Sequence, residues 1–477
     1  MDKTLRNKSN LYRNGKIWLL IALFCILSEA FSQENSGTRV LFVGDILLSR
    51  NVKQELLSRG TSPWDSLKLL FQTANFIIGN LEGAVGDNQN QINPINKSPV
   101  FAVDSSYIPL LNDAGFNIIT IENNHILDLG EEGKRNTISS LLNNNIKPIN
   151  FDNSPYFFSI NDIVLSLLTL NIVTNRDNSK NQVPSIELKQ KLRLARTLAD
   201  IVIVSIHWGS ELLEWPNSEQ REVAKWLIEK GTDIIIGSHS HVIQNPEIIE
   251  GKPVFFSLGN HLFDQKYPIT KEGLIVEIYI KDGVYRCNGI KTRTRKNSFY
   301  PEIKENIDFK FSLITYKHNY LRIHDYNIKP LSIVDINGNK TILQAFDDNV
   351  NVWNTRPISL ISIGTSKLDG ENEFLFTLEK HYSSLDNEIN VRPYVYSIDE
   401  KGIYARWRGS ALAWPLIDAQ FSPYDKEILC ALHRGDSFIN LDKTKNNNRI
   451  AAYKWNGFGF TGLSDSIVCE YCNTLFK

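Results

Sequence analysis

Short apolar runs recur through the first 300 residues, and several are continuous rather than alternating. Residues 118–121 and 201–206 are two such runs, and residues 40–43 and 76–78 follow the same pattern. Strands covered on both faces lack polar alternation, so these runs predict a mainly parallel sheet buried between two layers. In open α/β sheets, binding sites form beyond the carboxyl ends of such strands. We therefore look for functional side chains where each run ends.

Helix-like segments separate these runs. One runs from Ser185 to Ala199, and a second begins at Asn217 and stops at Gly231. Ser and Asn are favoured helix N-caps, and glycine commonly follows a helix end. Strand, helix and strand at this spacing predict crossover units and a parallel sheet. The expected fold class for residues 38–295 is therefore α/β.

The pattern changes after Arg295 to short alternating strands separated by turns rich in Asp, Asn and Gly. This pattern predicts an all-β domain over residues 310–477. Residues 373–378 resemble residues 427–432, which lie 54 positions later. A period of about 55 is long enough for propeller-like blades. Two or three blades cannot close a full propeller, so an open stack or a sandwich fits equally well.

The first 32 residues form a separate segment. Five Lys and Arg residues precede an apolar core at residues 17–27, and Ala30-Phe31-Ser32 follows it. This order is typical of a secretory signal peptide cleaved after Ser32, and eleven apolar residues are too few to span a bilayer. We expect an exported protein in the periplasm or at the cell surface. The alternative is an uncleaved segment that anchors the chain to the membrane.

Charge and cysteine content narrow the choice of partners. Residues 1–32 carry five positive and two negative charges, so their removal changes the net charge from −1 to −4. A negative net charge does not favour binding to nucleic acid. Four cysteines remain, and Cys469-Glu-Tyr-Cys472 can close a small disulfide or form half of a zinc site. No second pair has suitable spacing, so a structural or unpaired role is favoured.

Polar side chains follow six of the apolar runs. They include carboxylates, amides and five of the nine histidines: Asp45; Asn80 with Glu82; Asn123, Asn124 and His125 with Asp128; His207; His239 with His241; and Asn260 with His261. Together these groups form a ligand set for divalent transition metals. Taken singly, Asp45 also suits a helix N-cap and His207 a buried core position. The whole set is far less probable by chance than any one member.

The same residues, in the same order, resemble the motifs of the bacterial CapA family, which is associated with capsule and poly-γ-glutamate synthesis. The motifs are Gly44-Asp45 with Arg50, Asn80-Leu-Glu82, Asn123 to Gly130, His207 to Glu211, Gly237 to Gln244, and Ser257 to Asn260. The resemblance covers residues 38–295. It implies a metallophosphatase-like α/β sandwich with mainly parallel strands, related to the calcineurin-like metallophosphoesterases.

The resemblance also implies roles for individual residues. Asp45 and His241 would hold one metal, and Asn124, His207 and His239 the other, with Glu82 in the place of the bridging carboxylate. His125 would be the acid near the leaving group, with Asp128 beside it as a second catalytic residue. Two divalent ions, Mn, Fe or Zn, would bind substrate oxygens and activate water. Substrate contacts are expected from Arg50, Asn80, Asn123, Trp208, Glu211 and Asn260.

Several positions depart from the family pattern. Leu47 stands where phosphoesterases have a second histidine, and Glu82 stands where they have a bridging Asp. Ser240 replaces the proline of a His-Pro-His motif, and His261 replaces a phenylalanine. His261 is either an extra ligand or a packed ring, and packing is favoured. Trp208 can stack on a substrate, although a tryptophan beside a strand end more often belongs to the core.

Three functional hypotheses follow. The first is an exported metal-dependent hydrolase that acts on a phosphoester, or on an amide or acyl bond in an envelope polymer. The second is a non-catalytic factor that holds an anionic envelope polymer during export or attachment. In the third, the β domain is a surface-binding module. Expected partners are the anionic polymer or a phosphorylated small substrate, together with membrane-bound synthesis or export proteins.

Overall fold

The fold is described from a computed structural model. The described residues are 37–86, 99–160, 162–307, 314–315, 318–323, 326–335, 338–347, 350–355, 357–370, 372–383, 388–399, 402–408, 412, 415–434, 448–472 and 475–476. The expected signal peptide, residues 1–32, lies outside them. Among the described residues, no helix is both long and apolar enough to cross a membrane.

The first of two large sheets has nine strands. Its path is β18-β17-β16-β1-β2-β5-β6, while β15 pairs with β1 and β19 with β17. Neighbours from β1 to β6 are parallel, as is β15 on β1, whereas β16 to β19 are antiparallel. The strand bounds are β1 Thr38–Ile46, β2 Phe76–Leu81, β5 Ile118–Thr120, β6 Lys147–Ile149, β15 Asn260–Leu262, β16 Glu272–Lys281, β17 Val284–Thr294, β18 Pro301–Ile307 and β19 Ile314–Thr315.

The second sheet has six strands in the order β12-β13-β10-β9-β8-β7. Its four central strands are parallel, and an antiparallel strand closes each edge. Their bounds are β7 Tyr156–Ile160, β8 Ile163–Asn171, β9 Ile201–His207, β10 Ile234–Ser238, β12 Glu247–Ile249 and β13 Lys252–Phe255. Short pairs and 3-10 turns complete the domain: β3 Ala84–Val85, β4 Ala102–Val103, β11 Ile243–Gln244, β14 Ser257–Leu258, η1 Asp65–Leu67, η2 Ser105–Tyr107 and η3 Pro268–Lys271.

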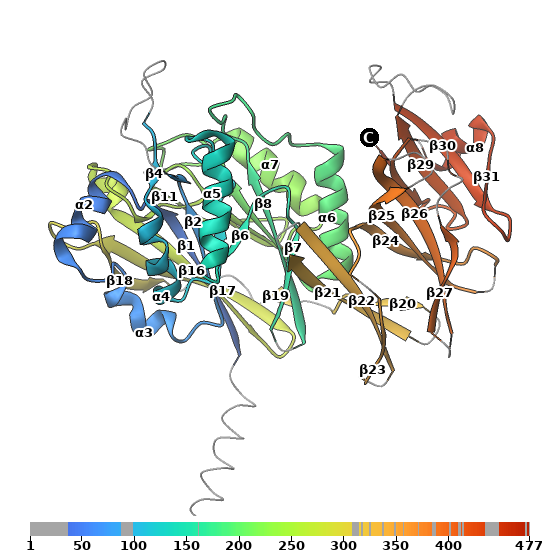
Figure 1. The fold of residues 1–477 in the computed structure, drawn as a ribbon, viewed down its shortest axis with the longest axis horizontal. Helices are drawn as coiled ribbons and strands as arrows, with labels where there is room; N and C mark the ends of the chain where they lie inside the picture. Colours follow the sequence, from blue (N-terminus) through green and yellow to red (C-terminus); the bar gives the residue numbers. More distant parts are fainter. Residues whose placement is uncertain are drawn as a thin grey trace, which may run out of the picture.

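The two sheets pack face to face through one apolar core. Phe42, Ile78 and Ile118 of the first sheet belong to the same buried cluster as Ile203 and Ile236 of the second. Helices cover the outer faces (Figure 1). The first face carries α2 Arg50–Arg59, α3 Lys68–Phe71, α4 Pro109–Ala114 and α5 Gly130–Asn143, and the second carries α6 Ile186–Leu198 and α7 Ser218–Glu229. The predicted α/β sandwich with mainly parallel central strands is confirmed.

The predicted helix starts agree with the cap geometry. The Ser185 side chain accepts a hydrogen bond from the Leu188 amide at the start of α6. Asn217 and Gln220 form a reciprocal capping box at the start of α7. Both caps satisfy amide groups that a helix end leaves without intrahelical partners. The domain also extends past residue 295, because β18 and β19 pair with β17.

The C-terminal region consists of three four-stranded antiparallel sheets, each formed by consecutive strands (Figure 1). The strands are β20 Leu321–Ile323, β21 Tyr326–Asp335, β22 Gly338–Asp347, β23 Val350–Asn354, β24 Leu360–Ser366, β25 Phe374–Ser383, β26 Glu388–Asp399, β27 Gly402–Arg408, β28 Leu416–Phe421, β29 Ile428–Arg434, β30 Asn448–Trp455 and β31 Phe460–Gly462, followed by helix α8 Asp465–Tyr471. The sequence repeat falls on equivalent strands, since β25 and β29 are both second in their sheets.

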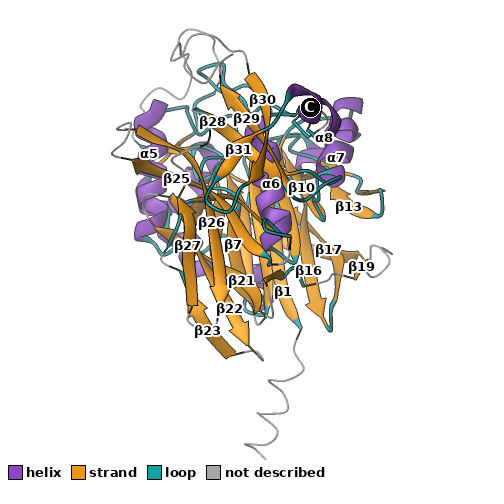
Figure 2. Ribbon diagram, turned by 90° about the vertical axis from the view of Figure 1, so that its right-hand side faces the viewer, coloured by secondary structure: helices purple, strands orange, loops and turns teal. Residues whose placement is uncertain are grey.

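The α/β region and the β region share a buried core. Leu198 and Val202 lie in one apolar cluster with Ile328, Leu343 and Leu375 of the β region. Strand β21 lies beside β7 (Figures 1 and 2), and β24 packs on α6 (Figure 1). The β region is therefore packed directly against the second sheet and its helix.

A charged pair reinforces this contact. Arg193 of α6 donates from Nη2 to Asp418 Oδ1 at 2.7 Å and from Nη1 to Oδ2 at 3.2 Å. The Asp418 side chain is only 4% exposed. We expect Arg193→Ala to lower the free energy of unfolding by about 1–3 kcal/mol, because it leaves a buried carboxylate without its partner. Chemical denaturation measures this loss.

The double variant Arg193→Met/Asp418→Leu is the control for that prediction. It removes both charges, so it should cost less than Arg193→Ala alone. A double variant less stable than the single one would show that packing, and not the unpaired charge, causes the loss.

A disulfide joins Cys430 of β29 to Cys472 after α8, and Cys469 is free and exposed. The predicted alternative of a Cys469–Cys472 disulfide is therefore wrong, whereas the favoured structural role is confirmed for Cys472. The two bonded cysteines are 42 positions apart, so the bond restricts a long loop of the unfolded chain.

Cys472→Ser is expected to lower the free energy of unfolding of the oxidised protein by about 2–4 kcal/mol. Cys469→Ser is the matched control and should leave it unchanged. Thermal unfolding with and without reductant measures both variants. Equal stability of Cys472→Ser and the wild type under oxidising conditions would contradict the assignment.

Candidate metal centre

The predicted strand-end residues come together at one edge of the two sheets. Asp45 near the end of β1 is in register with Asn80 of β2 and with Asn260 of β15. Close backbone packing sets this register, because the Asp45 amide donates to the Gly259 carbonyl at 3.0 Å. A Cβ atom at Gly44 would lie 2.0 Å from that same oxygen. Gly44 therefore permits the approach that brings Asp45 to the site.

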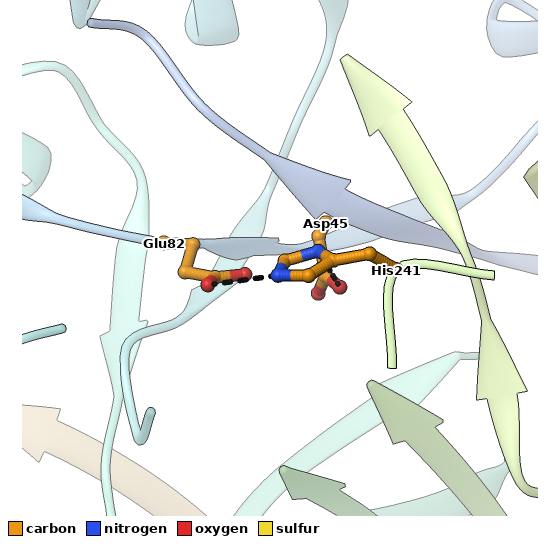
Figure 3. Close-up of side chains that lie close together, drawn as sticks. All are labelled: Asp45, Glu82 and His241. Atoms are coloured by element: carbon orange, nitrogen blue, oxygen red, sulfur yellow. Dashed lines mark ion pairs between the residues drawn. The ribbon is translucent and has the colours of Figure 1, made fainter. Parts of the chain in front are cut away.

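Asp45, Glu82 and His241 form a compact buried trio (Figure 3). One potential ligand atom from each side chain lies within 4.8 Å of the other two. His241 Nε2 is 3.6 Å from Glu82 Oε1, and His241 Nδ1 is 3.4 Å from Asp45 Oδ2. Two carboxylates and an imidazole from three separate elements therefore face one small volume.

Glu82 provides the best test of whether a metal fits here. Its side chain is fully buried, and neither oxygen has a hydrogen-bond partner among the described residues. A buried carboxylate without donors is costly unless it is paired or binds a metal. Burial raises the pKa of Glu82, while the nearby His241 opposes that rise. The donor set and the unsatisfied oxygens both fit a divalent cation.

Asn260 fixes the orientation of the His241 ring. Its Nδ2 donates to Gln265 Oε1 at 3.0 Å and to the Thr270 carbonyl at 3.2 Å. Its Oδ1 is thereby left as an acceptor 3.0 Å from His241 Nδ1. A proton on Nδ1 leaves the Nε2 lone pair free, which is the usual state of a metal-binding histidine. Burial alone would lower the pKa of His241, but Glu82 and Asp45 raise it to about 9.

A second group contains the three residues expected to hold another metal. His207 Nε2 lies 2.8 Å from Asn124 Oδ1 and 3.1 Å from His239 Nδ1. Burial lowers the pKa of His207 well below its usual value and that of His239 to about 3. Neutral imidazoles are the form that binds metals. Ser240 in place of the proline does not separate the two histidines of the turn, because the ring centroids of His239 and His241 are 6.1 Å apart. The His239 amide also donates to Asp45 Oδ2 at 3.3 Å.

His125 lies at the border of the trio. Its ring stacks on Phe101 with centroids 3.9 Å apart, and its Nε2 is 3.7 Å from Glu82 Oε1. On the other side, His125 Nδ1 is 2.9 Å from Asp128 Oδ2. Asp128 also accepts hydrogen bonds from the Phe101 amide at 2.7 Å and from Arg176 Nε. Asp128 therefore orients His125 through Nδ1, on the side of the ring opposite the nitrogen that faces the trio.

Sequence reasoning missed Arg176. It lies in the loop after β8 and pairs with Asp128, and its Nη2 also donates to the Pro99 carbonyl at 2.7 Å. The apolar pattern predicts the strand but not which loop residue turns back to the site. The one available signal is a basic residue in a polar loop, and Lys180 in the same loop gives the same signal.

Some expected substrate contacts belong instead to the framework of the site. Asn80 donates to Asp45 Oδ1 at 2.9 Å and accepts from Asn123 at 3.1 Å. Asn123 is fully buried and also donates to the Leu81 carbonyl at 2.9 Å. These amides, like Asn260, hold the ligands in place. In this structure the polar atoms of all three side chains bond to protein groups, and their direct contact with a substrate stays a prediction.

Trp208 is another of the expected substrate contacts. It is fully buried in the apolar cluster beneath α7, and its indole nitrogen donates to the Phe256 carbonyl at 2.7 Å. It is a core residue, as the packing alternative proposed. Arg50 pairs with Asp264 at 2.9 Å, whereas Glu211 is exposed beyond β9. Glu211 therefore remains the solvent-facing member of the expected substrate contacts.

Two departures from the family pattern are packing positions. Leu47 is buried against Phe101 and Phe263. His261 Nε2 accepts a hydrogen bond from Trp64 Nε1 at 3.0 Å. Burial lowers the pKa of His261 to about 3. His261 is therefore a packed ring, and Leu47 contributes an apolar wall where a ligand would otherwise stand.

Comparisons with known proteins agree with these motifs. Residues 39–265 match the family described as "Bacterial capsule synthesis protein PGA_cap". The PGA biosynthesis protein CapA of Bacillus subtilis is 27% identical over 50% of this chain and 67% of its own length. The capsule biosynthesis protein CapA of Bacillus anthracis is 26% identical over 52% of this chain and 66% of its own length. The alignments thus span about two thirds of these relatives.

A phosphatase structure from Mycoplasma pneumoniae covers 59% of this chain and 94% of its own, at 15% identity and a TM-score of 0.32. That score is too low to support any conclusion about mechanism. The family match covers the strand ends that carry Asp45, Glu82, Asn124, His207 and His241. Through its α/β region, this chain is similar to the bacterial CapA proteins of capsule synthesis.

Proposed function

We propose that this chain is an exported metal-dependent hydrolase of capsule or poly-γ-glutamate biosynthesis. The observation that carries the proposal is the buried trio of Asp45, Glu82 and His241, with two Glu82 oxygens that accept no hydrogen bond from the described residues. A stable protein rarely keeps such a carboxylate unless a ligand compensates for its burial. The names of the curated relatives supply the biological setting.

The first metal would be held by Asp45, Glu82 and His241, and a second by Asn124, His207 and His239. Bound ions of this kind supply Lewis acidity and activate water for attack on a carbonyl or phosphoryl group. Imidazole and carboxylate ligands favour Mn, Fe or Zn. Asn80 and Asn260 keep the ligand atoms of Asp45 and His241 directed at the site.

His125 would be the proton donor to the leaving group. Phe101 fixes the plane of its ring, and Asp128 holds Nδ1. Its Nε2 is thereby left directed toward Glu82 and the trio. A histidine oriented by a carboxylate on one nitrogen and presented on the other is a common acid catalyst. The bond cleaved is a phosphoester, or an amide or acyl bond of an envelope polymer.

A second candidate function is a non-catalytic factor that holds an anionic polymer during export or attachment. The observation that favours it is Leu47, which packs against two phenylalanines where phosphoesterases place a further histidine. The contacts among Asn124, His207 and His239 point the same way, since these groups already satisfy one another. In this role the chain would act with membrane-bound synthesis or export partners.

Metal analysis of the purified mature protein, with activity assays, tests the proposal. The substrates are a phosphomonoester, a phosphodiester and a γ-linked glutamate oligomer. We expect stoichiometric Mn, Fe or Zn and turnover of one substrate, both reduced by His239→Ala. His318→Ala removes an exposed histidine far along the chain and serves as the control. Metal without turnover would favour the polymer-holding role, and no stoichiometric metal would contradict both metal assignments.

A further inference from the structure

A cleft of about 610 Å³ lies between the α/β region and the β region. One wall comes from α6 and the start of β7, and the opposite wall comes from β24, β25, β26, β28 and β29. Its size suits a small ligand or a short polymer segment, and ligand sites often occur between domains. None of the described residues that line it belongs to the metal centre.

The cleft carries an excess of positive charge. Its lining includes two acids, Asp152 and Glu187, and each already has a lysine partner. Asp152 Oδ2 lies 3.4 Å from Lys134 Nζ, and Glu187 Oε1 lies 3.7 Å from Lys191 Nζ. Lys380 and Arg434 are exposed on the opposite wall, and neither forms an ion pair with any described residue. Two cationic side chains therefore remain available to an anionic ligand.

The position of Lys191 strengthens this charge pattern. Its Nζ donates to the Ser154 carbonyl at 2.7 Å and lies 4.8 Å from the Phe151 ring centroid. These contacts hold a third cation within the cleft. Burial lowers the pKa of Lys191, the carboxylates of Glu187 and Asp152 oppose that lowering, and the positive charge of Lys380 adds a little to it. An anion placed between the two lysines would relieve their mutual repulsion.

The remaining surface of the cleft is largely apolar. Leu194 and Leu360 form part of its floor, and Ile389 lies at the rim with 62% of its surface exposed. A phosphate-rich polymer would gain little from such a surface. A chain of carboxylates separated by methylene groups would place its charges on Lys380 and Arg434 and its methylenes on the apolar residues.

We propose that this cleft binds a short segment of a carboxylate-rich polymer, such as γ-linked glutamate, at a site separate from the metal centre. The choice of polymer rests on the proposed function, whereas the cleft and its charge do not. A site of this kind would hold the polymer chain while another segment occupies the metal centre. It also gives the β region a role in the function of the chain.

The test is calorimetric titration of the full mature chain with a γ-linked glutamate octamer. Lys380→Ala/Arg434→Ala is expected to weaken binding about tenfold, because two exposed ion pairs together contribute about 1.4 kcal/mol. Binding should also weaken as salt increases. Lys367→Ala is the matched control, since it removes an exposed lysine from the turn between β24 and β25, outside the cleft, and it should bind like the wild type. Thermal unfolding checks that all variants fold.

Further arms separate this proposal from that of the metal centre. His241→Ala, tested without added metal, should keep octamer binding at the cleft. Loss of binding in His241→Ala, with none in the cleft double variant, would place the ligand at the metal centre and overturn the cleft proposal. Equal affinity for the octamer and for inorganic polyphosphate would overturn the carboxylate preference. No binding to the wild type would overturn the cleft site and leave the metal analysis unaffected.

Discussion

Glu82→Gln is expected to abolish metal binding at the trio without destabilising the metal-free protein. The substitution keeps the shape of the side chain and removes a buried charge whose oxygens accept no hydrogen bond from the described residues. The free energy of unfolding without metal should therefore equal the wild-type value or exceed it by about 1–2 kcal/mol. Mn²⁺ at about 100 times its Kd should add about 2.7 kcal/mol to the wild type and nothing to the variant.

Glu122→Gln is the matched control for this prediction. Glu122 is a half-buried glutamate beyond a strand of the first sheet, and its Oε2 accepts a hydrogen bond from the Phe151 amide at 2.7 Å. Its substitution should leave the response to Mn²⁺ intact. A Glu82→Gln protein that is much less stable without metal would identify Glu82 as a structural residue and contradict its assignment as a ligand.

Asp128→Asn is expected to lower kcat about 100-fold with little change in KM. Asp128 holds His125 Nδ1 at 2.9 Å, and Arg176 and the Phe101 amide hold Asp128 in turn. Asparagine keeps the size of the side chain but loses the charge that orients the ring and stabilises its protonated form. Steady-state kinetics on the substrate found in the panel measure the effect.

Arg176→Ala should cause a smaller fall in kcat, because Asp128 keeps two of its three contacts. Asp177→Asn is the control, since Asp177 is an exposed carboxylate next to Arg176 that, among the described residues, bonds only within its own loop. It should leave both kinetic constants unchanged. A rise in KM at constant kcat for Asp128→Asn would show that Asp128 serves substrate binding instead.

Much of the α/β region was predictable from the sequence. Strands buried on both faces lack polar alternation, and the runs that end at Asp45, Glu82 and His207 are of this kind. Because parallel strands place their carboxyl ends at one edge of a sheet, the polar residues that follow them had to gather there. The order of the motifs then supplied the family. The helix caps Ser185 and Asn217 were also predicted correctly, because a cap depends only on its own helix.

The roles that the sequence left open or misassigned concern contacts between distant positions. Trp208 follows a strand end like the proposed ligands, yet its indole nitrogen turns inward to the Phe256 carbonyl, 48 positions away. His261 is held by Trp64, which lies 197 positions earlier. Cys472 pairs with Cys430 rather than with its neighbour Cys469. Periodicity shows where a chain is buried, but not which distant group satisfies a polar atom there.

Anomalous diffraction from crystals of the mature protein grown with Mn²⁺ tests the central claim most directly. We expect an anomalous peak among Asp45, Glu82 and His241, within coordination distance of an oxygen of Glu82. No peak between these three side chains, while Mn²⁺ occupies other positions in the same crystal, would contradict the metal centre.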